Sequence, residues 1–473
     1  MILKTFMLTI ILLSSLFNSC GETYSNGYNI DITINGVEDN TILIAYHFGD
    51  KKYIKDTLET DNRGHTVFSG EERLPGGIYL VVMPDMDYFE IMIDREQEFS
   101  LVTSREKPLE DMKIAGSREN ELFVDYQLFM NKSQTESASL RERLNRNSDN
   151  PDSLSIIREK MEEVDNRVMG YWDNLINEYP DSFIAALVKA MKQPEIPEIK
   201  VPPDSENPDS VRWTMRYNYN RERYFDNIDF SDSRLLRTPV LHNKINSFFN
   251  RFLQQHPDSI IPEADRVVEL AKADDEVYQY VLVYLLNNFE RSSVMGLDEV
   301  FVHLAEKYYL SGQAPWANDD MLKRLRDRVE RIKPNLIGRK AKDMRMTKPD
   351  GSEISLHQVD AEYIIIYFYE PECSFCKQVT PELTRLLSEY SNMGVEVFGV
   401  YILGDSDEWN RYIAENELDN WINVYDPRHS SNFRFNYDIH SVPTLYLLDG
   451  SKTIIAKQIG IDTLKNILEE ELN

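Results

Sequence analysis

The feature that most constrains this chain is an apolar run that leads into a pair of cysteines. Residues 362–370 read "EYIIIYFYE", a β-branched and aromatic run that is typical of a buried central strand. The motif "CSFCK" begins at Cys373, and the segment from there to about Ser391 has a helical pattern. Cys373 and Cys376 therefore fall at the junction between a buried strand and the helix that follows it.

Strand and helix patterns continue to alternate after this junction. Strands are expected at "VEVFGVYI" and "INVYD", a hairpin at "TLYLLDGSKTIIAKQIG", and helices at "SDEWNRYIAENEL" and "DTLKNILEEEL". This alternation predicts an α/β domain over residues 334–473.

Two regions of different periodicity precede that domain. Residues 28–116 contain alternating or short apolar blocks separated by turn signals, which predicts an antiparallel, sandwich-like β domain. Residues 117–333 have helical periodicity and predict an all-α domain, in which the proline-rich segment 192–210 forms an exposed loop. At 473 residues the chain is too long for one ordinary core, so we expect a multidomain protein.

The N-terminus has the pattern of an export signal. A positive charge at Lys4 precedes an apolar run that is too short for a comfortable membrane span. The run ends in "FNSC", which resembles the lipobox of bacterial lipoproteins and implies lipidation of Cys20. We expect a signal peptide at 1–19 and a tether at 20–27. A plain secretory signal is the alternative, and both predict an exported chain.

The charge balance argues against one class of partner. The chain has 80 acidic and 52 basic residues, which leaves a formal net charge of -28. Such a charge repels polyanions, so we expect no nucleic-acid partner.

The position of the cysteine pair predicts thiol chemistry. Unpaired N–H groups and the positive end of the helix dipole stabilise an anion at a helix N-terminus, so we expect Cys373 to attack as a thiolate. Cys376 follows in the first turn, within reach of the first sulfur, and should be more buried. It would resolve a mixed disulfide, after which the two cysteines would form the redox disulfide.

Four other interpretations of the chain compete with this one. A zinc or copper site needs two further ligands that the sequence does not supply at ligand spacing, so we expect no metal and no cofactor. A purely structural disulfide would close a very small loop and stabilise little. A peroxidase of the peroxiredoxin type needs Thr or Ser three residues before its cysteine, which neither cysteine has. The non-enzymatic alternative is an envelope scaffold or binding lipoprotein with an accessory redox domain.

Residues 334–473 resemble the thioredoxin-like domains of the TlpA and ResA type. The resemblance rests on "CSFCK" after the strand, on the inserted segment "EWNRYIAENELDNWINVYDP" and on "IHSVPTLYLLD". It implies a thioredoxin fold with a cis peptide bond between Val442 and Pro443, which would face the cysteines and expose backbone for pairing with a substrate strand. An ordinary trans turn proline is the alternative.

The chain departs from that family beside the cysteines. Tyr367 stands where thioredoxins carry a buried carboxylate, and Val379 stands where the ResA type carries a glutamate. Glu372 replaces the usual tryptophan. We expect Glu370 and Glu372 to weaken thiolate stabilisation and so favour a reductant, and Lys377 to favour the thiolate slightly. The alternative is that both glutamates are solvated loop charges.

These features together predict a lipid-anchored thiol-disulfide oxidoreductase that faces the periplasm of a bacterial envelope. Its partners would be envelope proteins that carry disulfides, a membrane electron donor that restores the dithiol, and the membrane itself through the lipid on Cys20. The β-rich region carries no convergent set of catalytic residue types.

Overall fold

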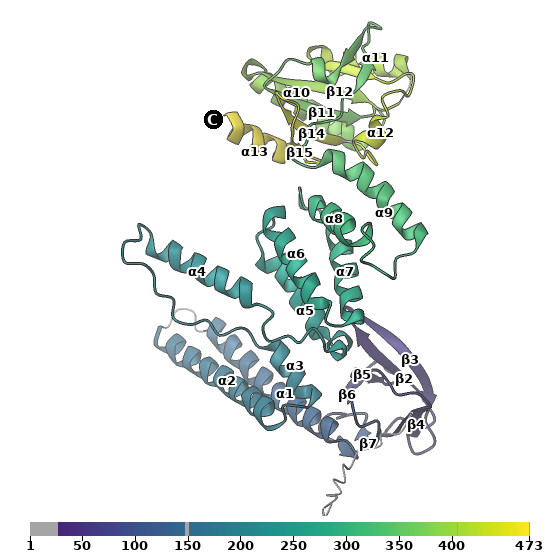
Figure 1. The fold of residues 1–473 in the computed structure, drawn as a ribbon, viewed down its shortest axis with the longest axis vertical. Helices are drawn as coiled ribbons and strands as arrows, with labels where there is room; N and C mark the ends of the chain where they lie inside the picture. The colour runs from purple at the N-terminus through teal and green to yellow at the C-terminus, as the bar shows by residue number, and fades with distance from the viewer. Residues whose placement is uncertain (1–26, 147–150, 404, 473) are drawn as a thin grey trace, which may run out of the picture. The chain divides into compact units, whose positions relative to one another are not determined.

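The computed structural model describes residues 27–146, 151–403 and 405–472 (Figure 1). The signal peptide expected at 1–19 and the expected lipidation site at Cys20 lie outside these residues. The chain divides into two compact units. Among the described residues, the first unit holds those up to 212 with 222–229 and 234–243, and the second holds 213–221, 230–233 and those from 244 onward.

Two four-stranded sheets enclose the core of the N-terminal β region. One sheet has the strand order β4-β1-β7-β8 and the other has the order β3-β2-β5-β6. Apolar residues that alternate along the strands, such as Ile32, Ile44 and Val81, form one buried cluster. The strands are β1 (Tyr28–Asn35), β2 (Thr41–Phe48), β3 (Lys51–Glu59), β4 (His65–Gly70), β5 (Gly77–Val82), β6 (Tyr88–Ile93), β7 (Glu98–Ser104) and β8 (Lys113–Ala115).

The pairing of β1 with β7 corrects the expectation of a purely antiparallel β domain. These two strands run parallel, with Ile30 beside Phe99 and Ile32 beside Leu101. The other pairs in the two sheets are antiparallel. Parallel neighbours require a crossover connection, and the chain between β1 and β7 passes through the other sheet before it returns.

A buried asparagine attaches the first helix to this β region. Three helices follow the strands within the first unit: α1 (Arg118–Arg146), α2 (Pro151–Glu178) and α3 (Phe183–Met191). The side-chain amide of Asn120 donates to the carbonyl of Met92 at 2.7 Å and accepts from its N–H at 2.8 Å. Because β6 is an edge strand, this side chain satisfies backbone groups that the sheet leaves unpaired.

The proline-rich loop is shorter than the sequence analysis predicted. Helix α4 (Pro208–Arg223) begins inside the expected loop 192–210, which therefore ends at Asn207. The side chain of Asn207 accepts a hydrogen bond from the N–H of Ser210 at 3.1 Å and caps the helix. Pro208 occupies the first turn, where its missing N–H removes no helical hydrogen bond.

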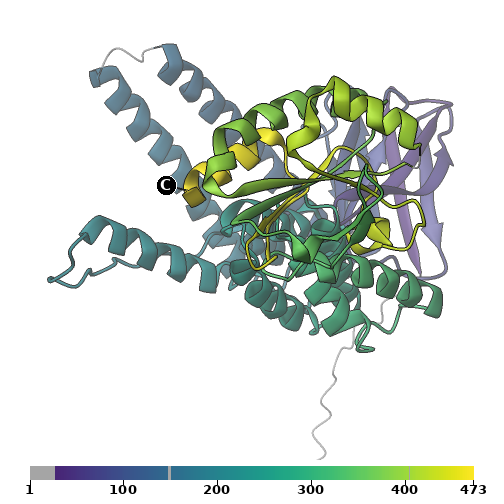
Figure 2. The same cartoon turned by 90° about the horizontal axis from the view of Figure 1, so that it is seen from above.

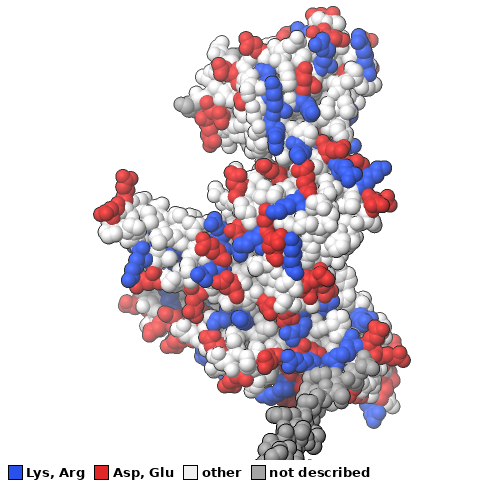
Figure 3. Space-filling model, viewed as in Figure 1, with Lys and Arg blue, Asp and Glu red and all other residues white. Residues whose placement is uncertain are grey.

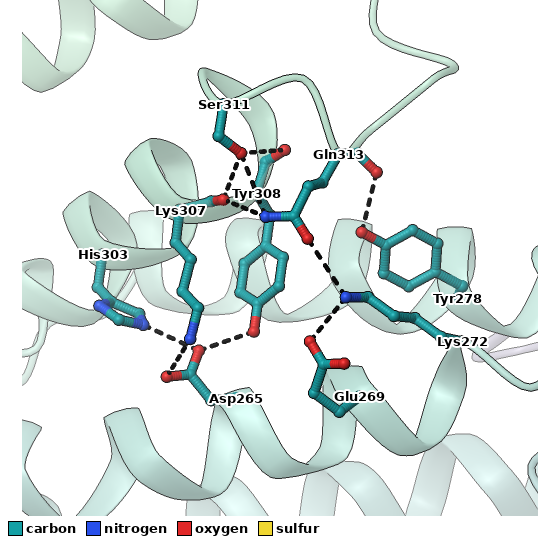
Figure 4. A network of polar contacts seen from close by, with 9 residues as sticks. All are labelled: Asp265, Glu269, Lys272, Tyr278, His303, Lys307, Tyr308, Ser311 and Gln313. Carbon is teal, nitrogen blue, oxygen red and sulfur yellow. Dashed lines mark hydrogen bonds and ion pairs between the residues drawn. The ribbon is translucent and has the colours of Figure 1, made fainter.

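The stretch 117–333 is helical as expected, but its helices divide between the two units. Asp265 on α6 connects this helix with α8 and η3 in the second unit (Figure 4). Its carboxylate forms hydrogen bonds with His303 at 2.9 Å and Tyr308 at 2.8 Å and an ion pair with Lys307 at 2.8 Å. The remaining helices of the stretch are α5 (Pro239–Ser247), α6 (Pro257–Ala271), α7 (Asp275–Glu290), α8 (Asp298–Leu304) and α9 (Asp319–Ile332), with π-helical turns η2 (Phe248–Phe252) and η3 (Ala305–Tyr309).

A seven-stranded mixed sheet forms the centre of the C-terminal region, in the order β10-β9-β13-β12-β11-β14-β15. Figures 1 and 2 show this sheet, in green to yellow, with helices on either side of it. The central strand β11 pairs parallel with β12 and antiparallel with β14. Side chains of β11 alternate between the faces: Tyr367 packs with α10, α11 and α13, and Phe368 packs with α12 on the other face.

The elements of this region follow the predicted order of strands and helices. They are β9 (Arg345–Thr347), β10 (Glu353–Ser355), β11 (Tyr363–Tyr369), α10 (Ser374–Tyr390), β12 (Val395–Tyr401), α11 (Ser406–Glu415), β13 (Ile422–Tyr425), α12 (Phe433–Asn436), β14 (Thr444–Asp449), β15 (Ile454–Lys457) and α13 (Ile461–Leu472). Short 3-10 helices are η1 (Ser233–Arg237), η4 (Lys333–Asn335), η5 (Leu356–Gln358), η6 (Ser391–Met393) and η7 (Leu418–Asn420).

The fold class predicted from the sequence is confirmed: β sheets come first, helices follow, and an α/β region ends the chain. Within the part that the structure describes, no helix combines the length and apolar character needed to cross a membrane. On the face shown in Figure 3, acidic and basic side chains are interspersed. The net charge of -28 is thus not gathered into one patch on that face.

Candidate active site

Cys373 lies immediately before helix α10, in the capping position of the helix. Strand β11 ends at Tyr369, four residues that end in Cys373 follow, and α10 begins at Ser374. The Cys373 sulfur accepts a hydrogen bond from the backbone N–H of Cys376 at 3.2 Å, as an N-cap side chain does. Negative charge on this sulfur would therefore be stabilised by a free N–H group and by the helix dipole.

The loop before β14 faces the same sulfur from the other side. The Val442–Pro443 peptide bond is cis. The Cys373 thiol donates to the carbonyl oxygen of Val442, with the sulfur and oxygen 3.5 Å apart. The structure therefore brings together Cys373, Cys376, Val442 and Pro443, the four residues that the sequence analysis placed at the centre of the site.

Cys376 is the buried member of the pair. Cys373 is half-buried, Cys376 is fully buried, and both are free thiols. Burial raises the pKa of the Cys376 thiol to about 12, and the neighbouring Cys373 adds to the rise. The backbone of Glu370 and the hydroxyl of Tyr367 offset this pKa shift in part. Cys376 is therefore a neutral thiol at neutral pH.

Three buried hydroxyl groups lie beneath Cys376, and we call Tyr367, Thr380 and Tyr412 the hydroxyl floor. The Tyr367 hydroxyl lies 3.1 Å from the Thr380 hydroxyl and 3.4 Å from the Cys376 carbonyl. The Tyr412 hydroxyl donates to Thr380 at 2.8 Å. Burial raises the pKa of Tyr367, so its hydroxyl is neutral at neutral pH. It can donate a hydrogen bond, but it cannot act as a base at neutral pH.

The sequence analysis identified Tyr367 but missed its two partners. Thr380 is four residues after Cys376, so both lie on the same face of α10. A threonine on the buried face of an amphipathic helix was the available signal. Tyr412 comes from α11, and no local pattern links it to the cysteines.

Comparison with known proteins assigns this part of the chain. Residues 337–460 match the AhpC/TSA family, whereas residues 28–123 and 157–335 match two domains of unknown function, DUF4369 and DUF5106. Residues 337–460 form a thioredoxin-like domain. The thioredoxin fold that the resemblance implied for this region is thereby confirmed.

Several known proteins are similar to part of this chain. The chain is 23% identical to the thiol-disulfide oxidoreductase ResA of Bacillus cereus over 137 residues, which cover 28% of this chain and 74% of that protein. The resemblance to ResA-type proteins that the sequence analysis stated is thereby confirmed, and the chain is a thioredoxin-like thiol-disulfide oxidoreductase. A domain of a possible thiol-disulfide isomerase from Cytophaga hutchinsonii is 34% identical, with a TM-score of 0.28 over 29% of this chain and 92% of that one. A thioredoxin-like protein from Bacteroides caccae is 22% identical, with a TM-score of 0.44 over 59% of this chain and 98% of that one.

The rim of the thioredoxin-like domain around Cys373 is charged and exposed. Lys377 and Glu372 form an ion pair at 3.3 Å, with side chains 52% and 77% exposed. Such a pair contributes about 0–1 kcal/mol, and its two charges largely cancel at a distance. Glu370 contacts Cys373 through its backbone, because its carbonyl accepts a hydrogen bond from the N–H of Cys373 at 3.4 Å. A groove of about 430 Å³ beside this rim is lined by Glu372, Lys377 and residues of α11.

The remaining positions named from the sequence lie in different surroundings. Val379 is partly buried against the core of the thioredoxin-like domain, so its position offers no acid to Cys376. Cys20 is outside the described residues. Among the residues that the structure does describe, no group of three or more His, Cys, Asp or Glu side chains is placed to hold a metal ion.

Proposed function

We propose that this chain reduces disulfides of envelope proteins by thiol-disulfide exchange through Cys373 and Cys376. The proposal rests on the positions of the two cysteine sulfur atoms. The Cys373 sulfur is held between the N–H of Cys376 at 3.2 Å and the carbonyl of Val442 at 3.5 Å, while the Cys376 thiol is buried behind it. The first sulfur can reach a client, and the second can reach only the first.

The exchange proceeds in two balanced steps. The Cys373 thiolate attacks one sulfur of the client disulfide; the client S–S bond breaks, a mixed disulfide forms, and the departing client sulfur takes a proton. Cys376 then gives its proton to water and attacks the Cys373 sulfur; the bond between Cys373 and the client breaks, and the departing client sulfur takes a proton and leaves as the second client thiol. The client gains two electrons, and the Cys373–Cys376 pair loses them as it forms a disulfide.

The buried thiol supports one direction of electron flow. Strong oxidants of this class have a reduced form stabilised by a low-pKa thiolate. Here burial raises the pKa of Cys376 to about 12, and the ion pair of Glu372 with Lys377 leaves no net positive charge at the rim to stabilise a thiolate. We therefore propose a reductant. Because an exported protein works in an oxidising compartment, its dithiol would be restored by a membrane electron donor.

A client would bind across the loop that contains the cis-proline. Extended client backbone next to its disulfide would pair with the backbone at Val442, as strand addition does elsewhere. Phe375, between the two cysteines, is 66% exposed and offers an apolar contact beside the reacting sulfur.

We also propose that the protein is a lipoprotein anchored through Cys20 and facing the periplasm. The support is the apolar run followed by "FNSC" at the N-terminus. Cys20→Ser should abolish incorporation of a labelled fatty acid and move the protein from the membrane fraction to the soluble fraction. Continued lipid labelling of Cys20→Ser would refute the anchor.

The catalytic proposal is tested with the full chain and a protein disulfide such as that of insulin. Cys373→Ser should lower the rate of disulfide reduction by at least about 1,000-fold, because the remaining thiol of the domain, Cys376, is fully buried and cannot reach a client disulfide. Cys376→Ala should instead accumulate a mixed disulfide on Cys373, which non-reducing electrophoresis detects. Full activity in Cys373→Ser would overturn the proposal and favour the scaffold alternative.

A further inference from the structure

The C-terminal end of helix α9 in the helical stretch contacts a short segment of the thioredoxin-like domain. Arg328 donates from one guanidinium nitrogen to both carboxylate oxygens of Asp438, at 3.0 and 2.8 Å. Both residues belong to the second compact unit. The Asp438 side chain is only 8% exposed, so this ion pair is shielded from solvent on its acidic side. Removing the arginine would leave a buried carboxylate without its main cation.

Two further contacts join the same helix end to the same short segment. The Arg331 guanidinium lies 4.8 Å from the ring centre of Phe435. The amide of Asn335 donates to the carbonyl of Asn436 at 2.6 Å. Together with Arg328, these contacts hold α12 and the two residues after it against the end of α9.

The held segment leads directly into the loop that contains the cis-proline. Asp438 has a left-handed backbone, with φ of 49°, which a non-glycine residue keeps only where its surroundings hold it. His440 bonds the same Asp438 carboxylate at 2.9 Å. Val442, two residues further on, accepts the hydrogen bond of the Cys373 thiol. Side-chain contacts therefore connect Arg328 to Asp438 and His440, and the chain leads from His440 over two residues to Val442, which contacts the reacting sulfur.

We infer that Arg328 is a positioning residue for the redox site, which holds the Val442–Pro443 loop in place through Asp438 and His440. This inference rests on the proposed function and gives the last helix of the helical stretch a role in it. The loop would meet the client backbone, so its order before binding lowers the entropy lost on binding. A loosened loop should weaken client binding more than it slows the chemical step.

The test compares Arg328→Gln with Arg324→Gln in the full chain. Arg324 is an exposed arginine of the same helix and serves as the matched control. In Arg328→Gln, the KM for insulin should rise about three- to tenfold while kcat stays within about twofold. Alkylation of Cys373 by iodoacetamide at neutral pH should become about twofold faster, because the thiol loses its fixed acceptor at Val442.

Two more variants separate positioning from a loss of folding. Arg328→Lys keeps the charge but replaces the planar guanidinium by an ammonium group, so it should restore part of the KM change. His440→Ala breaks only the next contact and removes a side chain that is 63% exposed, so the fold should survive while KM still rises, by a smaller factor. If Arg328→Gln does not fold, the KM and the alkylation rate of His440→Ala test whether the contacts at Asp438 position the loop.

The outcomes distinguish this inference from the proposed function. If the unsubstituted chain fails to reduce insulin, the proposed function is wrong, and the alkylation rates still test the contact between α9 and the loop. If the chain is active but Arg328→Gln and His440→Ala match Arg324→Gln in KM and in alkylation rate, the positioning role of Arg328 is refuted.

Discussion

Beneath the cysteine pair three hydroxyl groups are buried and bonded to one another, whereas at the rim two opposite charges pair in solvent. The hydroxyl floor of Tyr367, Thr380 and Tyr412 is almost entirely buried. At the rim, Glu372 and Lys377 are each more than half exposed. Both regions belong to the site of the cysteine pair, but the floor lies beside the buried Cys376 and the rim lies around the half-buried Cys373.

The difference teaches which neighbours can control which sulfur. In a buried site the effective dielectric constant is low, so one hydrogen bond or one desolvated thiol changes protonation strongly. At an exposed rim, water and salt screen the charges, and an ion pair cancels most of its own field. We therefore expect Cys376 to be governed by burial and the floor, and the rim to adjust Cys373 only slightly.

The largest expected effect is the pH dependence of the resolving step. The thiolate of Cys376 is the reactive form, and its pKa of about 12 means that raising the pH increases the reactive fraction throughout the neutral range. In the mixed disulfide Cys373 has no thiol group left to raise the pKa of Cys376, but burial still raises it. The resolving rate should therefore rise about tenfold per pH unit from about pH 7 to about pH 9.

Stopped-flow release of a coloured thiol from Cys373 measures this rate. Cys376→Ala provides the control, since it should show no release that depends on the second cysteine. A rate that levels off below about pH 8 would mean that Cys376 ionises far more readily than its burial indicates, and the contrast between floor and rim would fail.

A smaller effect is expected from Tyr367→Phe. The Tyr367 hydroxyl lowers the pKa of Cys376, so its removal should raise that pKa and slow resolution about tenfold at neutral pH. The same release assay measures the change. Tyr401→Phe is the matched control, because Tyr401 is a buried tyrosine of the neighbouring strand whose hydroxyl faces Glu408 instead. Equal slowing in both variants would point to packing rather than to hydrogen bonding.

The smallest effect is expected at the rim. Glu372→Gln removes a negative charge near Cys373 and should speed its alkylation by iodoacetamide by less than about threefold, since the side chain is 77% exposed. The difference should disappear in about 1 M salt, where screening is nearly complete. A change of tenfold or more that persists in salt would show that the rim controls the nucleophile after all.

The sequence predicts well where local pattern and tertiary role coincide. The run at 362–370 is apolar on both faces, and β11 indeed occupies the centre of its sheet with both faces covered. The spacing of the two cysteines at the end of that strand is enough to place one at the cap of α10 and the other inside it. These features depend on neighbours in the chain, so periodicity and spacing capture them.

The sequence predicts poorly where a strand or a contact depends on distant residues. Strand β3, "KKYIKDTLE", is almost wholly exposed and polar, so it shows no apolar alternation, yet it pairs along its length with β2 at the edge of a sheet. The parallel pairing of β1 with β7 is likewise invisible to periodicity, because strand direction in a sheet follows from the path of the chain between the strands.

What the sequence by itself determined is the chemistry: two thiols at a helix start, a strand that buries their support, and a proline motif far along the chain. What only the tertiary structure decided is which distant side chains contact and position these groups. Tyr412 reaches Thr380 from another helix, and Arg328 reaches Asp438 across 110 positions. Side chains so far apart in sequence meet only when packing closes the chain, because no local backbone preference encodes such a contact.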